Sequence, residues 1–246
     1  MCLIVFDWQP GQRLLLAANR DEYYARPTAA MHIWPQHPDI VAGQDLQQGG
    51  SWLGVTRQGR IAMLTNVRLA GKTPADALSR GALVRDYLLS SRTAADYLRS
   101  IELDRYGPFN LICGSLQQLY YLSNAGQSEP QPIYAGIHAV SNAQLNSPWP
   151  KAELAKQQLA HFNGEELPLA LLNRRQPFAD ELLPDTGVDP TLEKQLSAQH
   201  IHIPAVYGTR CATAFELTPQ QIKIAEQSFD SKARPSHRCS WQWMIR

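Results

Sequence analysis

Short apolar runs, each bounded by turn-forming residues, recur along most of this chain. Their lengths and their content of β-branched and aromatic residues are typical of β-strands. We expect strands at 3–7, 13–19, 51–56, 60–67, 109–116, 118–123, 137–141, 201–207, 210–217, 221–229 and 238–244. Several neighbouring runs are separated by only a few residues, with turn formers such as Pro10-Gly11 between them, so antiparallel hairpins are predicted.

The first two runs are apolar at consecutive positions rather than at alternate ones. LIVF occupies 3–6 and LLLAA occupies 14–18. A strand with this pattern is covered on both of its faces. Antiparallel strands covered on both faces predict two stacked sheets with helices outside them, which is a layered α+β architecture.

Fewer segments carry helix signals. Thr73, Pro74 and Asp76 provide an N-cap, a first-turn proline and a capping-box acid for a helix that runs to about Leu89. Two further helices and a mixed segment are expected downstream: one opened by a capping box at Thr93 and Asp96, one from Ser147-Pro148 to Asn163-Gly164, and short helices broken by prolines over 165–198.

Composition and charge narrow the function classes. The chain has 246 residues, of which 44% are hydrophobic and 18% charged, and no linker or repeat divides it, so we expect one globular domain over 1–246. A net charge of +1 without a basic run argues against a nucleic-acid partner. No apolar run reaches the roughly 20 residues that cross a bilayer, and the first residues do not read as a secretion signal. We therefore expect a cytoplasmic protein.

The cysteines stand far apart in the sequence. There are four, Cys2, Cys113, Cys211 and Cys239, and no two form a Cys-x-x-Cys pair, so neither a zinc knuckle nor a redox pair is predicted and no metal is expected. Cys113 and Cys211 lie inside apolar runs and are expected to be buried thiols. Cys2 differs because of what lies opposite to it.

A hairpin at Pro10-Gly11 brings Cys2 beside a polar cluster. If these are the central residues of a two-residue turn, paired positions sum to 21, and Cys2 faces Asn19 with Arg20 and Asp21 just beyond. A looser turn that slips the register by about one residue would keep the same neighbours.

As the first residue of the chain, Cys2 would carry both a nucleophile and the base that activates it. A methionine before a small residue is commonly removed, and Cys2 would then carry both a thiol and an α-amine able to accept its proton. We expect Arg20 to favour the thiolate and lower its pKa, and Asp21 to hold or orient the amine. If Met1 is retained, Cys2 has no free amine. The structural alternative is that Cys2 is an ordinary strand residue and Arg20-Asp21 a surface ion pair.

Seven motifs, in this order, resemble the NRDE family, also called the transport and Golgi organisation family. They are MCLIVF, NRDEYYARP, GGSWLGV, LTNVR, FNL at 109–111, VSNAQLNSPWPK and YGTRCAT, and they extend from residue 1 to about 215. The family looks more distantly like the N-terminal nucleophile (Ntn) hydrolases, especially cysteine-first amidases. That resemblance implies a four-layer αββα sandwich of two stacked, mainly antiparallel sheets with outer helices.

The resemblance also implies a set of catalytic residues. Cys2 matches the nucleophile, Arg20 and Asp21 match the pair after the second strand, and Asn66 falls where an oxyanion-hole or pocket-side residue stands. Asn142 matches an oxyanion donor, and Arg210 matches the late arginine that steadies the nucleophile. Each has a structural alternative: Asn66 and Asn142 would cap a strand end or satisfy a turn, and Arg210 would pair with Asp21.

Two functions fit these residues. The first is cleavage of a small-molecule amide or thioester through an acyl-cysteine at Cys2, which requires no cofactor. The second, implied by the family's association with haem trafficking and with lipid or acyl-CoA metabolism, is a carrier that binds haem or an acyl ligand without turnover. A haem carrier needs an apolar slot and one axial histidine or cysteine. The seven histidines are scattered, and His200 and His202 are expected to share one exposed strand face.

Overall fold

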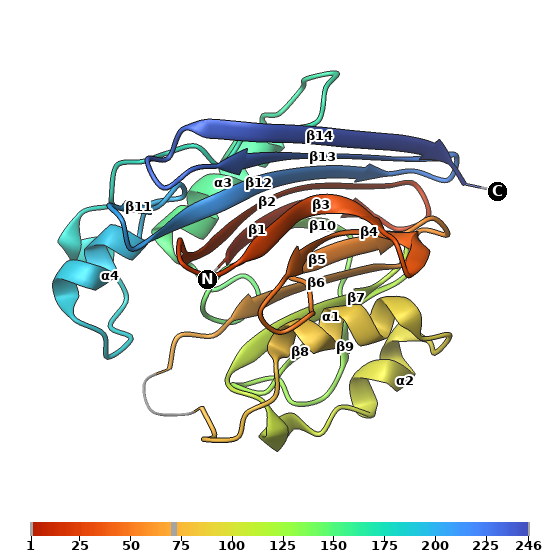
Figure 1. Cartoon of the computed structure of the whole chain (residues 1–246), viewed down its shortest axis with the longest axis horizontal. Coiled ribbons are helices and arrows are strands. Elements are labelled where there is room, and N and C mark those ends of the chain that lie inside the picture. Colours follow the sequence, from red (N-terminus) through yellow and green to blue (C-terminus); the bar gives the residue numbers. More distant parts are fainter. Residues whose placement is uncertain (1, 70–72, 246) are drawn as a thin grey trace.

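Two antiparallel sheets stack on each other, and the first two strands of the chain lie inside one of them (Figure 1). The structure is a computed structural model, and it describes residues 2–69 and 73–245. The first sheet has 7 strands in the order β10-β1-β2-β12-β13-β14, with β11 paired to β12. Their bounds are Cys2–Gln9 (β1), Arg13–Tyr23 (β2), Gly136–Val140 (β10), His202–Ile203 (β11), Tyr207–Leu217 (β12), Gln221–Phe229 (β13) and Pro235–Met244 (β14).

The second sheet also has 7 strands, and they pair in simple chain order from β3 to β9. This order follows from short hairpin connections between most of the neighbouring strands. The bounds are Thr28–Trp34 (β3), His37–Asp45 (β4), Leu53–Thr56 (β5), Ile61–Asn66 (β6), Phe109–Gly114 (β7), Leu119–Ser123 (β8) and Gln131–Pro132 (β9).

Helices cover the outer face of each sheet, which gives the four-layer αββα sandwich. On the second sheet these are α1 (Arg80–Leu89) and α2 (Ala94–Arg99), seen below that sheet in Figure 1. On the first sheet α3 (Pro150–Ala160) packs against β1 and β2. The remaining helical segments are short: Leu103–Arg105, Asp180–Leu182 and α4 (Pro190–Leu196).

The apolar runs in β1 and β2 are buried on both faces, as their pattern predicts. Ile4 and Phe6 point between the sheets, where they join the main core. Leu3 and Val5 point the other way and pack with Ala155 of α3. Because both faces are covered, β1 and β2 are held in the centre of the molecule, and the polar residues at the carboxyl end of β2 are held there with them.

The register of the β1–β2 hairpin differs by one residue from that of the two-residue turn expected from the sequence. Cys2 pairs with Arg20, and Leu3 pairs with Asn19. The turn contains three residues, 10–12, with Gly11 at a φ of +71°, a left-handed conformation that glycine adopts at little cost. The slip has a consequence, because residues paired across strands share a face: Arg20 rather than Asn19 points to the side of Cys2.

The sequence patterns missed three strands. β3 and β4 form a hairpin over 28–45, where mixed polar residues and two prolines obscure the alternation, and β9 is only two residues long. The expected strand at 201–207 shrinks to His202–Ile203. His200 is buried against the Phe229 ring, so its expected exposure is wrong, whereas His202 is exposed.

Helix ends were predicted less well than helix positions. The capping box of α2 is confirmed, because the Thr93 hydroxyl accepts from the Asp96 backbone N–H. The first helix begins at Arg80 and not near Thr73, and the third begins at Pro150 and ends at Ala160. The stretch 165–198 is mostly irregular around its two short helices.

Cys113 and Cys211 are buried as expected. Over residues 2–69 and 73–245, no helix combines the length and the hydropathy that crossing a membrane requires. The expected removal of Met1 concerns a residue outside the described ranges.

Candidate active site

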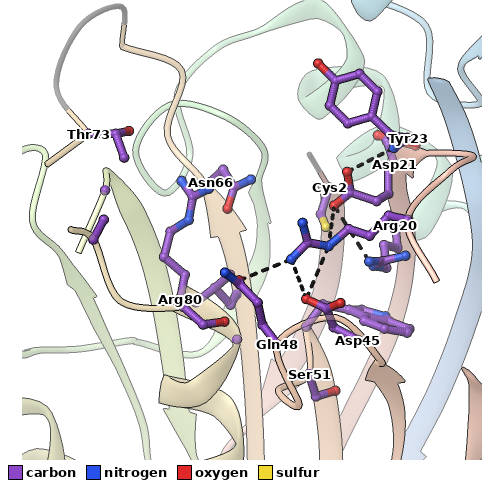
Figure 2. A pocket seen from close by; sticks show the side chains of 18 of the residues that line it. Cys2, Arg20, Asp21, Tyr23, Asp45, Gln48, Ser51, Asn66, Thr73 and Arg80 are labelled. Carbon is purple, nitrogen blue, oxygen red and sulfur yellow. Dashed lines mark hydrogen bonds and ion pairs between the residues drawn. The ribbon is translucent and has the colours of Figure 1, made fainter. Parts of the chain in front are cut away.

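Cys2 lines a cavity of about 500 Å³ between the carboxyl end of β2, the end of β6 and the start of α1. In the view of Figure 2, the Cys2 sulfur lies between Asn66 and Arg80 on one side and Arg20 and Asp21 on the other. Four residues expected from the sequence, Cys2, Arg20, Asp21 and Asn66, line this one cavity. Asn142 and Arg210 are not among the described residues that line it.

The Cys2 thiol is mostly shielded from solvent, with 8% of the residue exposed. Burial raises the pKa of this thiol, and the nearby Asp21 carboxylate raises it further, whereas Arg20 lowers it. Arg20 therefore acts in the expected direction, but burial outweighs it and the net shift of the thiol pKa is upward. A neutral thiol therefore predominates at neutral pH, and an acceptor for its proton is needed before it can attack.

Arg20 is held from three sides. Its guanidinium lies over the Trp52 ring, 4.3 Å from the ring centroid. Its Nη1 donates to the Thr28 hydroxyl at 3.1 Å, and its Nη2 lies 3.7 Å from a Glu22 carboxylate oxygen. With only 5% of the residue exposed, this is a fixed cation beside Cys2 and not a surface ion pair.

Asp21 is a buried carboxylate with a defined partner on β12. Its Oδ1 accepts a hydrogen bond of 2.7 Å from the Thr209 hydroxyl. Burial raises the pKa of Asp21, while Lys151 and the Thr209 bond lower it. Lys151, on α3, is itself buried, and burial lowers its pKa to about 8. Asp21 and Lys151 are thus two buried groups of opposite charge, and each favours the charged form of the other.

The first and last residues of the NRDE motif hold the surrounding chain. The Asn19 side-chain amide donates to the carbonyls of Leu172 and Gln199, at 2.8 and 2.9 Å. These bonds pin the irregular stretch 165–198 and its end to the first sheet. Glu22 lies between Arg20 and Arg26, at 3.7 and 3.9 Å. Each residue of the motif thus has its own set of contacts.

Two asparagines meet at the end of β6. Asn66 is the last residue of that strand and lines the cavity. Its backbone carbonyl accepts from the Asn142 Nδ2 at 2.9 Å, so one of the two amide hydrogens of Asn142 is in use. Ser141 links this pair to Cys2, because its hydroxyl donates to the Cys2 carbonyl at 3.1 Å. Asn142 is therefore linked to Cys2 through its neighbour Ser141.

Arg210 sits in a β-bulge that re-aims its side chain. Thr209 pairs with Asp21 and Cys211 pairs with Arg20, which leaves Arg210 as the extra residue of β12. Its Nη1 donates to the carbonyls of Tyr23, Tyr24 and Arg26, at 3.0, 3.3 and 3.2 Å. No ion pair joins Arg210 to Asp21 within the described residues, and Thr209 occupies the place that the alternative interpretation assigned to Arg210.

Several residues of the cavity were not identified from the sequence. Arg26, inside the quoted NRDEYYARP motif, donates to the Asp45 carboxylate at 2.6 Å and to the Gln48 side chain at 3.1 Å. Asp45 and Gln48 lie at the end of β4 and just after it, and no sequence signal pointed to them. Arg80 opens α1, whose start was misplaced. In the described part of the chain, no group of three or more His, Cys, Asp or Glu side chains could hold a metal ion.

Comparison with known proteins places the chain in a family. The family model for Transport and Golgi organisation 2 matches residues 1–231. The bovine Transport and Golgi organization protein 2 homolog is 35% identical over 87% of each chain, and the human homolog is 32% identical over the same shares. The Drosophila melanogaster Transport and Golgi organization protein 2 is 29% identical over 85% of each chain.

Two solved structures are more distant likenesses. One is a Caenorhabditis elegans ortholog of N-acylethanolamine-hydrolyzing acid amidase, with a TM-score of 0.44 and 16% identity, covering 65% of this chain and 78% of that one. The other is a mutant of conjugated bile acid hydrolase from Clostridium perfringens, with a TM-score of 0.41 and 8% identity, covering 100% and 98%. From the family model and the curated relatives, the chain belongs to the Transport and Golgi organisation 2 family.

Proposed function

We propose that the protein is a cysteine hydrolase that cleaves a small-molecule amide or thioester through an acyl-cysteine at Cys2. The observation that carries the proposal is the position of the thiol: Cys2 lines a cavity and is paired with Arg20, next to Asp21. Nucleophilic cysteines lie in such partly enclosed sites beside cationic groups and a base. Cys113, which is 0% exposed within the core, has no comparable opening.

The base in this proposal is the α-amine of Cys2 itself. Removal of Met1 would turn the backbone nitrogen of Cys2 into an amine with an ordinary pKa of about 7.7–8.0. Such an amine accepts protons near neutral pH, which a thiol with a raised pKa requires. Asp21, the neighbour of Arg20 on β2, would hold the ammonium form after the transfer.

The reaction then has two steps. The Cys2 sulfur attacks the carbonyl carbon of the substrate while its proton passes to the α-amine, which returns the proton to the leaving amine or thiol. Water next attacks the acyl-cysteine and gives a proton to the amine, and the amine passes this proton to the departing sulfur, which releases the acid and regenerates the free thiol. Atoms and electrons balance without any cofactor.

We assign the oxyanion to Asn66, the last residue of β6, whose side chain lies on the cavity. Asn142, which donates to the Asn66 carbonyl and does not line the cavity among the described residues, would position that donor. One such donor contributes about 10²–10³ in rate when it is fixed before the reaction. Arg210, which bonds to three carbonyls of the turn after β2, would steady the site through that turn.

The cavity restricts the size of the substrate. A volume of about 500 Å³ falls in the range of small-molecule pockets, roughly 300–1,000 Å³. Its lining mixes carboxylates, guanidiniums and amides with the Trp52 and Leu64 side chains, so a compact substrate with polar groups fits better than a long bare hydrocarbon.

Acyl transfer tests the proposal directly. Purified protein is incubated with short acyl thioesters of N-acetylcysteamine, and intact mass and peptide mapping follow the acyl group. We expect a single acyl group on Cys2 that disappears with time as free acid forms. The Cys2→Ala variant should show neither, whereas Cys239→Ser, which changes the other partly accessible thiol, should behave as the wild type. Acylation elsewhere, or turnover that survives Cys2→Ala, would contradict the proposal.

A further inference from the structure

Among the described residues, one arginine of the cavity has no carboxylate within ion-pair distance. Three arginines of the described residues line it: Arg20, Arg26 and Arg80. Arg20 lies beside Glu22, and Arg26 is paired with Asp45 at 2.6 Å. Within residues 2–69 and 73–245, Arg80 makes no ion pair and hydrogen-bonds only to a backbone carbonyl, that of Pro108. Burial lowers the pKa of Arg80, and the more distant Glu22 carboxylate offsets this only in part.

The Arg80 side chain is fixed in place and is not a loose surface group. Its Nη1 donates to the Pro108 carbonyl at 3.0 Å, and the Val67 backbone N–H donates to the same oxygen at 3.0 Å. The guanidinium is thereby held at the end of β6. A guanidinium has five N–H donors, so one bond to Pro108 leaves the others for a ligand.

An amide lies at the same end of the cavity. Asn66 precedes Val67, and in Figure 2 its side chain lies on the same side of the cavity as Arg80. The Asn66 carbonyl is used by Asn142, but its side-chain amide makes no hydrogen bond to the described residues. This amide is the one assigned to the oxyanion, so the remaining donors of the fixed Arg80 guanidinium beside it are left to receive a carboxylate.

We propose that Arg80 binds a carboxylate of the substrate, so that the compound attacked by Cys2 carries an acid group at some distance from the bond that is cleaved. The substrate class is thus an amide or thioester with a free carboxylate, such as an acyl derivative of an amino acid or a half-thioester of a diacid. This inference rests on the proposed function only where it calls the bound compound a substrate. The binding site itself requires only Arg80 and the cavity.

The charges around Arg80 favour a carboxylate over a phosphate. Glu22 and Asp45 line the same cavity, and both would repel a second negative charge on the ligand. One guanidinium also matches one carboxylate in a bidentate, singly charged pair. A phosphate dianion would need a further cation, and the other two arginines of the described lining already lie beside carboxylates.

A matched pair of thiol reagents tests the inference at Cys2. Maleimides N-substituted with a carboxyalkyl chain are compared with the corresponding carboxamides over several chain lengths, and the rate of labelling at Cys2 is measured by peptide mapping. At one chain length we expect the acid to react about tenfold faster than the amide, the gain typical of one charge-assisted pair. Arg80→Gln should bring this ratio to about one, and because both reagents react with the same thiol, the ratio is independent of any change in the reactivity of Cys2 itself.

Arg85→Gln is the matched control. Arg85 lies on the same helix but pairs with Asp86 at the surface, so its loss should leave the acid-to-amide ratio unchanged. Equal effects of Arg80→Gln and Arg85→Gln would mean that net charge alone attracts the acid, and this would overturn the inference. An acid-to-amide ratio near one at every chain length would overturn it as well.

A binding measurement separates this inference from the chemistry of Cys2. Calorimetric titration of the Cys2→Ala variant with glutaramate, which carries one carboxylate, with the diamide glutaramide and with inorganic phosphate requires no reactive thiol. We expect glutaramate to bind at least tenfold more tightly than the other two, and the added Arg80→Gln change to remove the difference. Absence of this preference would refute the carboxylate site even if Cys2 hydrolyses thioesters. Tighter binding of phosphate would refute the choice of carboxylate.

Discussion

Cys2 and Arg20 face each other across the β1–β2 hairpin and therefore leave the first sheet on the same face. The three-residue turn at 10–12 sets this register. In the register of a two-residue turn, Asn19 would take the place of Arg20, and the guanidinium would point into the layer of α3. The cation beside the thiol is thus a consequence of one turn residue, and its effect on the thiol can be measured.

Arg20→Gln should slow the alkylation of Cys2. Arg20 lowers the thiol pKa, which burial has raised, so its loss moves the pKa further upward and reduces the thiolate present at pH 8. The rate with iodoacetamide should fall several-fold at pH 8 and converge with the wild type at high pH. Arg13→Gln serves as the control, because Arg13 lies on the same strand as Arg20 but forms a partly exposed ion pair with Glu216. This variant should change neither the alkylation rate at pH 8 nor its dependence on pH.

The same labelling ranks the four cysteines. Cys113 and Cys211 are fully enclosed and their thiol pKa values are raised well above the usual value by burial, while burial raises the pKa of Cys239 to about 11. We expect Cys2 to be labelled first in competitive alkylation at neutral pH. Faster labelling of Cys239 would count heavily against an activated Cys2.

The Asp21–Thr209 bond predicts a separable effect on stability and on reactivity. Thr209→Val removes a donor from a buried carboxylate and should lower the free energy of unfolding by about 1–3 kcal/mol. Thr213→Val is a matched control, because Thr213 is a buried threonine on the same strand that donates to Glu226. Both variants should lose stability in urea unfolding, but only Thr209→Val should change the pH profile of Cys2 alkylation. Identical profiles would show that Asp21 does not act on Cys2.

Lys151 predicts a particular dependence of stability on pH. Its folded-state pKa of about 8 lies below the ordinary 10.5, so the unfolded chain binds a proton that the folded chain has released between these two values. The folded state therefore gains stability as pH rises through this window and loses it as pH falls back toward the folded pKa. Relative to Lys151→Met, the wild type should gain roughly 1–3 kcal/mol between pH 8 and pH 10 in urea unfolding. A constant difference between the two proteins would contradict the buried position of the ammonium group.

Haem binding remains a prediction, and the residues that line the cavity determine which variants should change the spectrum of bound haem. No histidine is among the described residues that line the cavity, and Cys2 is the one thiol among them. Haem held there should show a Soret band that shifts in Cys2→Ala and is unchanged when each histidine is replaced in turn. A shift caused by a histidine variant would place the haem elsewhere. Affinity no higher than that of an unrelated apolar protein would remove the carrier function.

The sequence predicted the layers of the fold because hydrophobic pattern determines them. Consecutive apolar residues in β1 and β2 meet core on both faces, as Leu3 and Ile4 illustrate. The hairpin of β3 and β4 was missed because its burial is uneven: the first residues of β4 are exposed and the last ones are buried, so no period of two runs through it. The helix signals at Thr73 failed because the Leu78 backbone N–H donates to the Arg105 carbonyl. This N–H is then not available for a helical hydrogen bond, and α1 begins only after it.

The candidate site was predicted in part for a similar reason. Cys2, Arg20 and Asp21 follow from hairpin pairing, which is a local rule and tolerates an error of one residue. The position of Arg210 depends on a β-bulge, and the position of Arg80 depends on where α1 begins and on the carbonyl of Pro108. These are tertiary features without a local sequence signal, so neither the contacts of Arg210 nor the place of Arg80 in the cavity could be found from the sequence.

The amino terminus decides between the enzymatic interpretation and the structural one. The proposed chemistry requires a free amine on Cys2, because the buried thiol has a raised pKa and needs a base. The measurement is the intact mass of the purified, natively expressed protein. We predict a mass lower than that of the full sequence by one methionine residue, with Cys2 as the first residue in peptide mapping. A mass that includes Met1 throughout the sample would contradict the mechanism.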